Sequence, residues 1–112
     1  PTHSKQDYNS IMAGLNCGTL SLVAWPALQS GIDLALTVDD DLCRRAMVLL
    51  AADGITSGES GAAGLAGLLR LMGDAGLAAA RQRLGIGADS RVLVFSTEGP
   101  TDPEAYAKAV SG

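Results

Sequence analysis

The segment SGESGAAGLAGLL, residues 57–69, restricts the possible fold more than any other part of the chain. Most of it has the composition of a helix, yet glycines recur at positions 61, 64 and 67. Glycine in a helix interior costs about 0.5–1 kcal/mol relative to alanine, so three of them need a structural reason. We expect that this helix packs unusually closely against a neighbour or that its first turn holds a ligand.

Glu59 comes just before this helix in the sequence, and two explanations fit it. An acidic side chain near a helix N-terminus is stabilised by the helix dipole by about 0.3–1 kcal/mol. In a functional role, Glu59 would lie beside a bound group while the glycines allow close approach. Gly61 and Gly64 resemble a phosphate cradle, but their spacing matches neither a P-loop nor a dinucleotide-binding fingerprint. From spacing alone, the structural explanation is slightly favoured.

Length and charge restrict the class of protein. The 112 residues suffice for one small domain. The net charge is −4 and the basic residues form no stripe, which argues against a nucleic-acid partner. No apolar run reaches the roughly 20 residues that a membrane-spanning helix needs, and the polar N-terminus does not resemble a signal peptide. We therefore expect a cytoplasmic protein with neither a nucleic-acid nor a membrane partner.

Two cysteines and one histidine leave little scope for metal or nucleophilic chemistry. Cys17 and Cys43 are expected to be free thiols in a reducing compartment, although a fold that brings them together would allow a disulfide. His3 lies in a polar leader and is interpreted as a solvated side chain. The aspartates at 39–41 fit a helix start better than a cation site, and no zinc-type spacing occurs. We expect no metal ion.

Hydrophobic periodicity and turn residues predict an α/β chain in which strands alternate with helices. An irregular leader is predicted over residues 1–9 and a short apolar turn over residues 10–15. Strands are predicted over residues 32–38 and 91–96. Helices are predicted over residues 20–29, from residue 40 to Gly54, over residues 61–72 and 75–84, and from Pro103 onward.

Helix boundaries carry recognisable capping residues. Four polar residues are predicted to cap helix N-termini: Asp39, Ser60, Asp74 and Asp102. Gly54 and Gly85 are predicted to end helices. Pro26 weakens or kinks the helix predicted over residues 20–29, because an interior proline removes a backbone hydrogen bond.

The predicted sheet is incomplete, because two strands alone are not stable in water. We infer that the chain is one end of a larger α/β enzyme. Ser96 ends the second strand, where open α/β sheets place their ligands, although serine is equally common in turns. Gly14 is either a turn glycine or a point of close backbone approach. Together with Glu59, these residues are interpreted as parts of one pocket.

Three segments of the chain carry a family resemblance: SIMAGLNCG at 10–18, GESGAAGLAGLL at 58–69 and STEGPTDPEAY at 96–106. In this order they resemble the C-terminal part of fold-type II pyridoxal-phosphate (PLP) enzymes. That family includes the tryptophan synthase β subunit, threonine and serine dehydratases and serine racemase. Within it, the resemblance is closest to the diaminopropionate ammonia-lyases, and it covers nearly the whole chain after the leader.

The resemblance implies that residues 10–112 form the C-terminal part of the large α/β domain and that the cofactor is pyridoxal 5'-phosphate. Ser96 matches the hydroxyl residue that hydrogen-bonds the pyridine nitrogen, with Thr97 beside it as the alternative. Glu59 matches the glutamate beside the cofactor ring. Gly14 matches a glycine whose backbone lines the cofactor and substrate cavity.

The chain also departs from the family. The glycine-rich phosphate loop is missing, and neither lysine lies in the apolar pocket that lowers the pKa of a cofactor-binding lysine. Lys5 lies in the polar leader and Lys108 in the last helix, so we expect no catalytic lysine and no catalysis by this chain alone.

For the complete enzyme, the resemblance implies a homodimer acting on an amino acid. The implied reaction is elimination of the β-amino group of 2,3-diaminopropionate to give pyruvate and ammonia. A threonine/serine dehydratase-like enzyme and a non-catalytic small-molecule-binding domain of the same fold are the alternatives.

Overall fold

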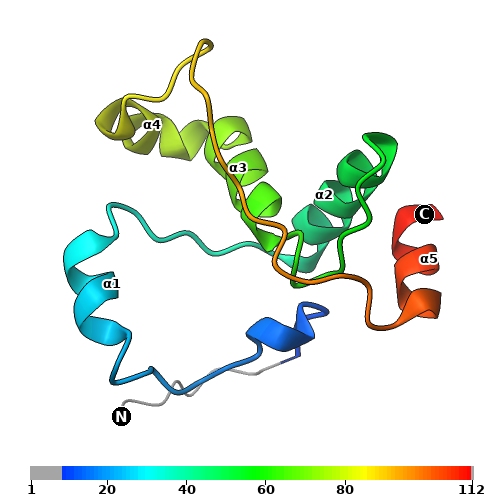
Figure 1. Cartoon of the computed structure of the whole chain (residues 1–112). Helices are drawn as coiled ribbons and strands as arrows, with labels where there is room; N and C mark the ends of the chain where they lie inside the picture. The colour runs from blue at the N-terminus through cyan, green and yellow to red at the C-terminus, as the bar shows by residue number, and fades with distance from the viewer. Residues whose placement is uncertain (1–8, 112) are drawn as a thin grey trace.

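The structure is a computed structural model that describes residues 9–111. Within these residues the chain forms two short 3₁₀ helices and five α-helices (Figure 1). In chain order they are η1 (Ala13–Leu15), α1 (Trp25–Gly31), α2 (Asp40–Ala52), α3 (Ala63–Gly73), η2 (Ala75–Leu77), α4 (Ala78–Leu84) and α5 (Pro103–Ser111). The leader predicted over residues 1–9 lies almost wholly outside the described residues, as do His3 and Lys5.

The two predicted strands do not pair, so the predicted alternation of strands and helices is not confirmed for residues 9–111. Residues 32–38 and 91–96 run without helix or β-ladder, and among residues 9–111 only Thr19 is assigned to a β-bridge. Within the described chain, residues 33–38 and 91–97 make no backbone–backbone hydrogen bond. A strand is defined by its neighbour, and these segments have no strand beside them.

A short apolar hollow lies between the two unpaired segments. It measures about 450 Å³ and is bordered by Ile32 and Leu34 on one side, by Val92 and Val94 on the other, and by α3. The bordering side chains are half-exposed; Ile32, for example, is 51% accessible. This hollow lies where the predicted sheet would lie against α3.

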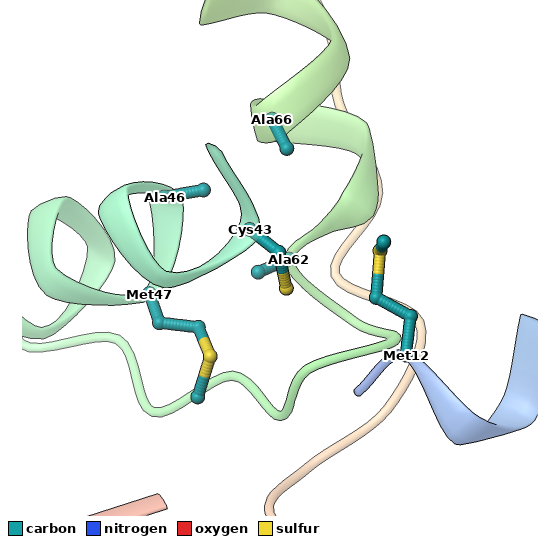
Figure 2. Packing of buried hydrophobic residues seen from close by; sticks show 6 residues of the cluster. All are labelled: Met12, Cys43, Ala46, Met47, Ala62 and Ala66. Carbon is teal, nitrogen blue, oxygen red and sulfur yellow. The ribbon is translucent and has the colours of Figure 1, made fainter. Parts of the chain in front are cut away.

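Helix α2 is the centre of the packed part, because it contacts both α3 and α5. Figure 2 shows side chains from both sides of the α2–α3 contact meeting in one cluster. Six residues form it: Met12, Cys43, Ala46, Met47, Ala62 and Ala66. Most of them are small, so the helices approach closely but bury few large side chains. The core is correspondingly small.

Both ends of α2 were predicted from the sequence and are confirmed. The Asp39 carboxylate accepts a hydrogen bond from the Leu42 backbone N–H at 2.8 Å, which caps the first turn. At the other end, Gly54 adopts a left-handed conformation with φ +79°. The Ile55 N–H then donates to the Leu50 carbonyl at 2.8 Å. This pattern is a Schellman motif, which satisfies the last carbonyls of the helix.

Helix α3 begins later than predicted. Ser60 was expected to cap a helix over residues 61–72, but the helix begins at Ala63 and has no side-chain cap. The Ser60 hydroxyl instead accepts a hydrogen bond from the Gly14 N–H at 2.9 Å. The expectation for Ser60 was wrong because its hydroxyl is hydrogen-bonded to Gly14, which is 46 residues away in the sequence.

The caps of the later helices are confirmed. The Asp74 carboxylate accepts from the Gly76 N–H at 2.8 Å, and the segment predicted as one helix divides into η2 and α4. Gly85 ends α4 with φ +70°. The Asp102 carboxylate accepts from the N–H groups of residues 104 and 105, both at 3.1 Å, ahead of Pro103.

Helix α1 differs from the helix predicted over residues 20–29. It begins at Trp25 and extends through Gly31, so Pro26 lies in the first turn. A proline there loses no hydrogen bond, which explains the late start. Helix α1 packs against no other helix of the described chain, and Figure 1 shows it standing apart from α2, α3 and α5. The radius of gyration is 15.1 Å, against about 13 Å for a compact domain of this length.

The helices of the described chain are short compared with a lipid bilayer. In residues 9–111, no single helix is long and apolar enough to cross a bilayer. Helix α3 together with the helical residues 75–84 meets the requirement by length and composition only, and the two are bent by 87°.

Candidate functional site

The three segments singled out in the sequence meet at the start of α3. The Gly14 N–H donates to the Ser60 hydroxyl at 2.9 Å, which ties η1 to the residues ahead of α3. The Gly58 N–H donates to the Glu98 carbonyl at 2.9 Å, which ties in the segment after residue 96. We call this meeting point, made of Gly14 and residues 57–61 and 96–99, the glycine junction.

Gly61 explains why the junction needs glycine. A methyl group on its α-carbon would overlap the Glu98 carbonyl oxygen, and it would lie 2.6 Å from the Ser57 hydroxyl oxygen. Gly58 is similarly close to Gly99, whose carbonyl carbon would lie 2.9 Å from a methyl group. The expectation of unusually close packing is therefore confirmed at Gly61. It does not hold at Gly67, where a methyl group would meet no atom within 4 Å.

Ser96 lies in the glycine junction. Its hydroxyl donates to the Ser57 hydroxyl at 2.8 Å. Ser57 is 1% accessible, whereas Ser96 is exposed. Ser57 was not predicted as a site residue, since an isolated serine before a glycine carries no pattern that reveals burial. Thr97, the alternative to Ser96, is exposed and makes no hydrogen bond within the described chain.

Gly14 lies beside two side chains of the junction. A methyl group on Gly14 would lie 3.0 Å from the Ser60 hydroxyl oxygen and 3.1 Å from the Glu98 carboxylate oxygen Oε2. The interpretation of Gly14 as a point of close approach is therefore confirmed. Glu98 was not predicted as a site residue, although it lies in the STEG motif and contributes both its backbone and its carboxylate to the junction.

Glu59 and Ser96 line different hollows. Glu59 is half-buried and borders a hollow of about 600 Å³ together with Arg44 and Lys108. Ser96 borders a smaller hollow of about 120 Å³ with Leu65. The structure thus places both residues at the start of α3 but does not bring them to one hollow.

The Cys43 thiol lies behind Glu59. It is fully buried and donates to the Glu59 carbonyl at 3.1 Å. Burial, together with the nearby carboxylates of Asp40 and Glu59, raises the pKa of Cys43 from 9.0 to about 11. Cys17 is exposed, and both cysteines are free thiols. Among residues 9–111, no three His, Cys, Asp or Glu side chains gather as ligands for a metal ion.

Comparison with known proteins decides the family. The model of the pyridoxal-phosphate dependent enzyme family matches residues 1–98. The chain belongs to this family. Its cofactor is therefore pyridoxal phosphate, and its fold type is type II, as the resemblance implied. The match extends over Gly14, Glu59, Ser96 and Thr97.

Similar proteins include bacterial lyases. The chain is 36% identical to the diaminopropionate ammonia-lyase of Salmonella typhimurium strain LT2 over 106 residues, which cover 89% of this chain and 26% of that enzyme. It is 33% identical to the diaminopropionate ammonia-lyase of Escherichia coli strain K12 over 109 residues, which cover 93% of this chain and 27% of that enzyme. The chain thus spans about a quarter of the length of these relatives.

The glycine junction is chemically suited to one edge of the cofactor. The exposed Ser96 hydroxyl can donate or accept a hydrogen bond, and either suits a pyridine nitrogen. The buried Ser57 hydroxyl is hydrogen-bonded to the Ser96 hydroxyl. Lys108 is exposed on α5, and Lys5 lies outside the described residues.

Proposed function

We propose that this chain is the C-terminal part of a pyridoxal-phosphate-dependent ammonia-lyase acting on 2,3-diaminopropionate. The products would be pyruvate and ammonia, since loss of the α-proton and of the β-amino group leaves an enamine that water hydrolyses. Two relatives with this name, similar over most of the chain, support the proposal. The observation that carries it is the glycine junction, where Ser96, Gly14 and the residues around Glu59 meet.

Each site residue has a proposed role. Ser96 hydrogen-bonds the pyridine nitrogen, and Thr97 is the alternative donor. Gly14 lines the cavity with its backbone, which suits its position against Ser60 and Glu98. Glu59 is proposed beside the cofactor ring. Its support is that residues 57–61 contact both other segments of the junction, while Glu59 itself borders a hollow separate from that of Ser96.

The neutral hydroxyl of Ser96 suits elimination chemistry. When bound, the cofactor withdraws electrons from the α-carbon of an amino acid. A hydroxyl at the ring nitrogen does not force protonation of that nitrogen, whereas a carboxylate would favour the protonated form. The withdrawal is then weaker, which limits side reactions and suits loss of a β-substituent.

The chain by itself is proposed to be inactive. A lysine must lie in an apolar pocket to bind the cofactor covalently, and the exposed Lys108 does not meet this condition. The complete enzyme would supply that lysine, the phosphate-binding loop and the group that removes the α-proton. It is also proposed to be a homodimer.

The remainder of the enzyme is proposed to complete the sheet. Residues 33–38 and 91–97 make no backbone–backbone hydrogen bond within the described chain, and the apolar hollow between them faces α3. Hydrogen exchange tests this part. Amides in these two segments should exchange rapidly in the 112-residue chain and at least 100-fold more slowly in the complete enzyme. Rapid exchange in both would contradict a completed sheet.

Product analysis on the complete enzyme tests the activity. Purified enzyme should release two molecules of ammonia for each pyruvate formed from 2,3-diaminopropionate, one from the β-elimination and one from hydrolysis of the enamine. Faster turnover of threonine or serine would instead identify a dehydratase, and cofactor binding without turnover of any of these would identify a binding domain. The Ser96→Ala variant should bind the cofactor more weakly and turn over more slowly. Light scattering on the same preparation measures the subunit number.

A further inference from the structure

Within the described chain, the Ser57 hydroxyl is hydrogen-bonded to Ser96 alone. Ser57 is 1% accessible, and within residues 9–111 its only hydrogen-bond partner is the Ser96 hydroxyl at 2.8 Å. A serine hydroxyl offers one donor and two acceptor positions. A buried hydroxyl that loses its partner destabilises the fold. Ser57 therefore has no alternative to this contact once it is buried.

Gly61 keeps Ser57 in this position. The Ser57 oxygen would lie 2.6 Å from a methyl group on Gly61, so the space it occupies exists only because residue 61 is glycine. On the other side of the pair, Ser96 is exposed. The Ser96 hydroxyl can thus hydrogen-bond the buried Ser57 hydroxyl and a ligand on its exposed side at the same time.

We propose that Ser57 is a positioning residue that fixes the Ser96 hydroxyl toward the pyridine nitrogen of the cofactor. The inference rests on the role proposed above for Ser96. The two hydroxyls form a chain whose direction can reverse. When Ser96 donates to an unprotonated ring nitrogen, Ser57 donates to Ser96. When the nitrogen carries a proton, Ser96 accepts that hydrogen bond and donates to Ser57.

This reversal involves rotation of two O–H bonds and no transfer of a proton between the serines. Hydrogen bonds in such a chain strengthen one another, so Ser57 makes Ser96 a better donor than an isolated serine. Removal of the Ser57 hydroxyl should therefore weaken the hydrogen bond from Ser96 to the ring nitrogen, although Ser57 itself does not contact the ligand.

A double-mutant cycle in the cofactor-free 112-residue chain tests the contact. Thermal unfolding is measured for Ser57→Ala, Ser96→Ala and the double variant. Because one hydrogen bond joins the two residues, the double variant should have a melting temperature no lower than the less stable single variant. Additive losses in melting temperature would overturn the inference.

The complete enzyme tests the positioning role. The enzyme is loaded with pyridoxal phosphate carrying ¹⁵N in the ring, and the nitrogen resonance is recorded. Ser57→Ala should move the resonance in the same direction as Ser96→Ala but by a smaller amount. It should also raise the dissociation constant of the cofactor roughly 3- to 10-fold. Ser57→Thr, which keeps the hydroxyl, should restore the original resonance.

Ser10→Ala is the matched control, because the Ser10 hydroxyl also makes a tertiary contact, to the Asp40 carboxylate at 2.6 Å, but does not touch Ser96. It should leave the resonance unchanged. If Ser96→Ala moves the resonance and Ser57→Ala does not, the positioning role is wrong and the proposed role of Ser96 stands. If Ser96→Ala leaves the resonance unchanged, the role of Ser96 is wrong and the inference fails with it.

Discussion

The α-carbon of Gly61 lies directly against the backbone of Glu98, with no room for a side chain between them. Gly61→Ala should therefore destabilise the chain, because either the 96–99 segment or the start of α3 must move. Overpacking of this kind typically costs about 1–3 kcal/mol. Chemical denaturation of the 112-residue chain measures the loss.

The chain provides its own control for Gly61. Gly67 lies inside α3, and a methyl group there would meet no atom within 4 Å. Gly67→Ala should stabilise the chain by about 0.5–1 kcal/mol, since alanine favours the helix. Equal effects at the two positions would show that helix propensity, and not contact with Glu98, governs them.

The Asp39 cap gives a prediction for α2. Asp39→Ala removes the acceptor for the Leu42 N–H and should cost about 1 kcal/mol of unfolding free energy. Asp39→Asn keeps an oxygen acceptor and should retain most of that stability. Helix content by circular dichroism follows both variants, and an equal loss in the two would assign the effect to charge.

Burial of Cys43 gives a prediction for thiol reactivity. Only the thiolate reacts with alkylating reagents, and the pKa of Cys43 is raised to about 11 by burial. Iodoacetamide at pH 8 should modify the exposed Cys17 and leave Cys43 unmodified until the chain is unfolded. Peptide mass spectrometry reads both sites, and rapid labelling of Cys43 in the native chain would contradict its burial.

The same thiol gives a pH dependence of stability. The unfolded Cys43 thiol ionises near pH 9, and the folded one near pH 11. Between these values the unfolded state has lost a proton that the folded state keeps, so stability falls as pH rises. The total loss should be roughly 2–3 kcal/mol. The Cys43→Ala variant should not show this loss of stability between pH 9 and pH 11. Denaturation of both proteins at pH 8, 9.5 and 11 measures the difference.

Helix ends were predictable because their signals are local. Asp39 and Asp102 accept hydrogen bonds from residues two or three positions away, and Gly54 and Gly85 adopt the left-handed conformation that glycine favours. For Gly14 the sequence left two interpretations open, a turn glycine or a point of close backbone approach, and the structure supports the second. At the helix ends, the hydrogen-bond partner lies within three residues or the residue is a glycine with a left-handed backbone.

The remaining elements depended on distant partners. The strands over residues 32–38 and 91–96 have suitable composition, but the described chain offers no strand to pair with them. Ser60 has the identity of a cap, yet its hydroxyl is taken by Gly14, 46 residues away. Ser57 could not be selected, because its burial depends on Gly61 and on Ser96 together.

The isolation of α1 has an evolutionary consequence. Since α1 touches none of the other helices of the described chain, insertions, deletions or substitutions in the arm formed by residues 20–31 should leave the α2–α3–α5 cluster unchanged. Selection on the arm must come from what it meets outside this chain, whereas selection on the cluster comes from its own interior. The two parts should therefore accumulate mutations at different rates.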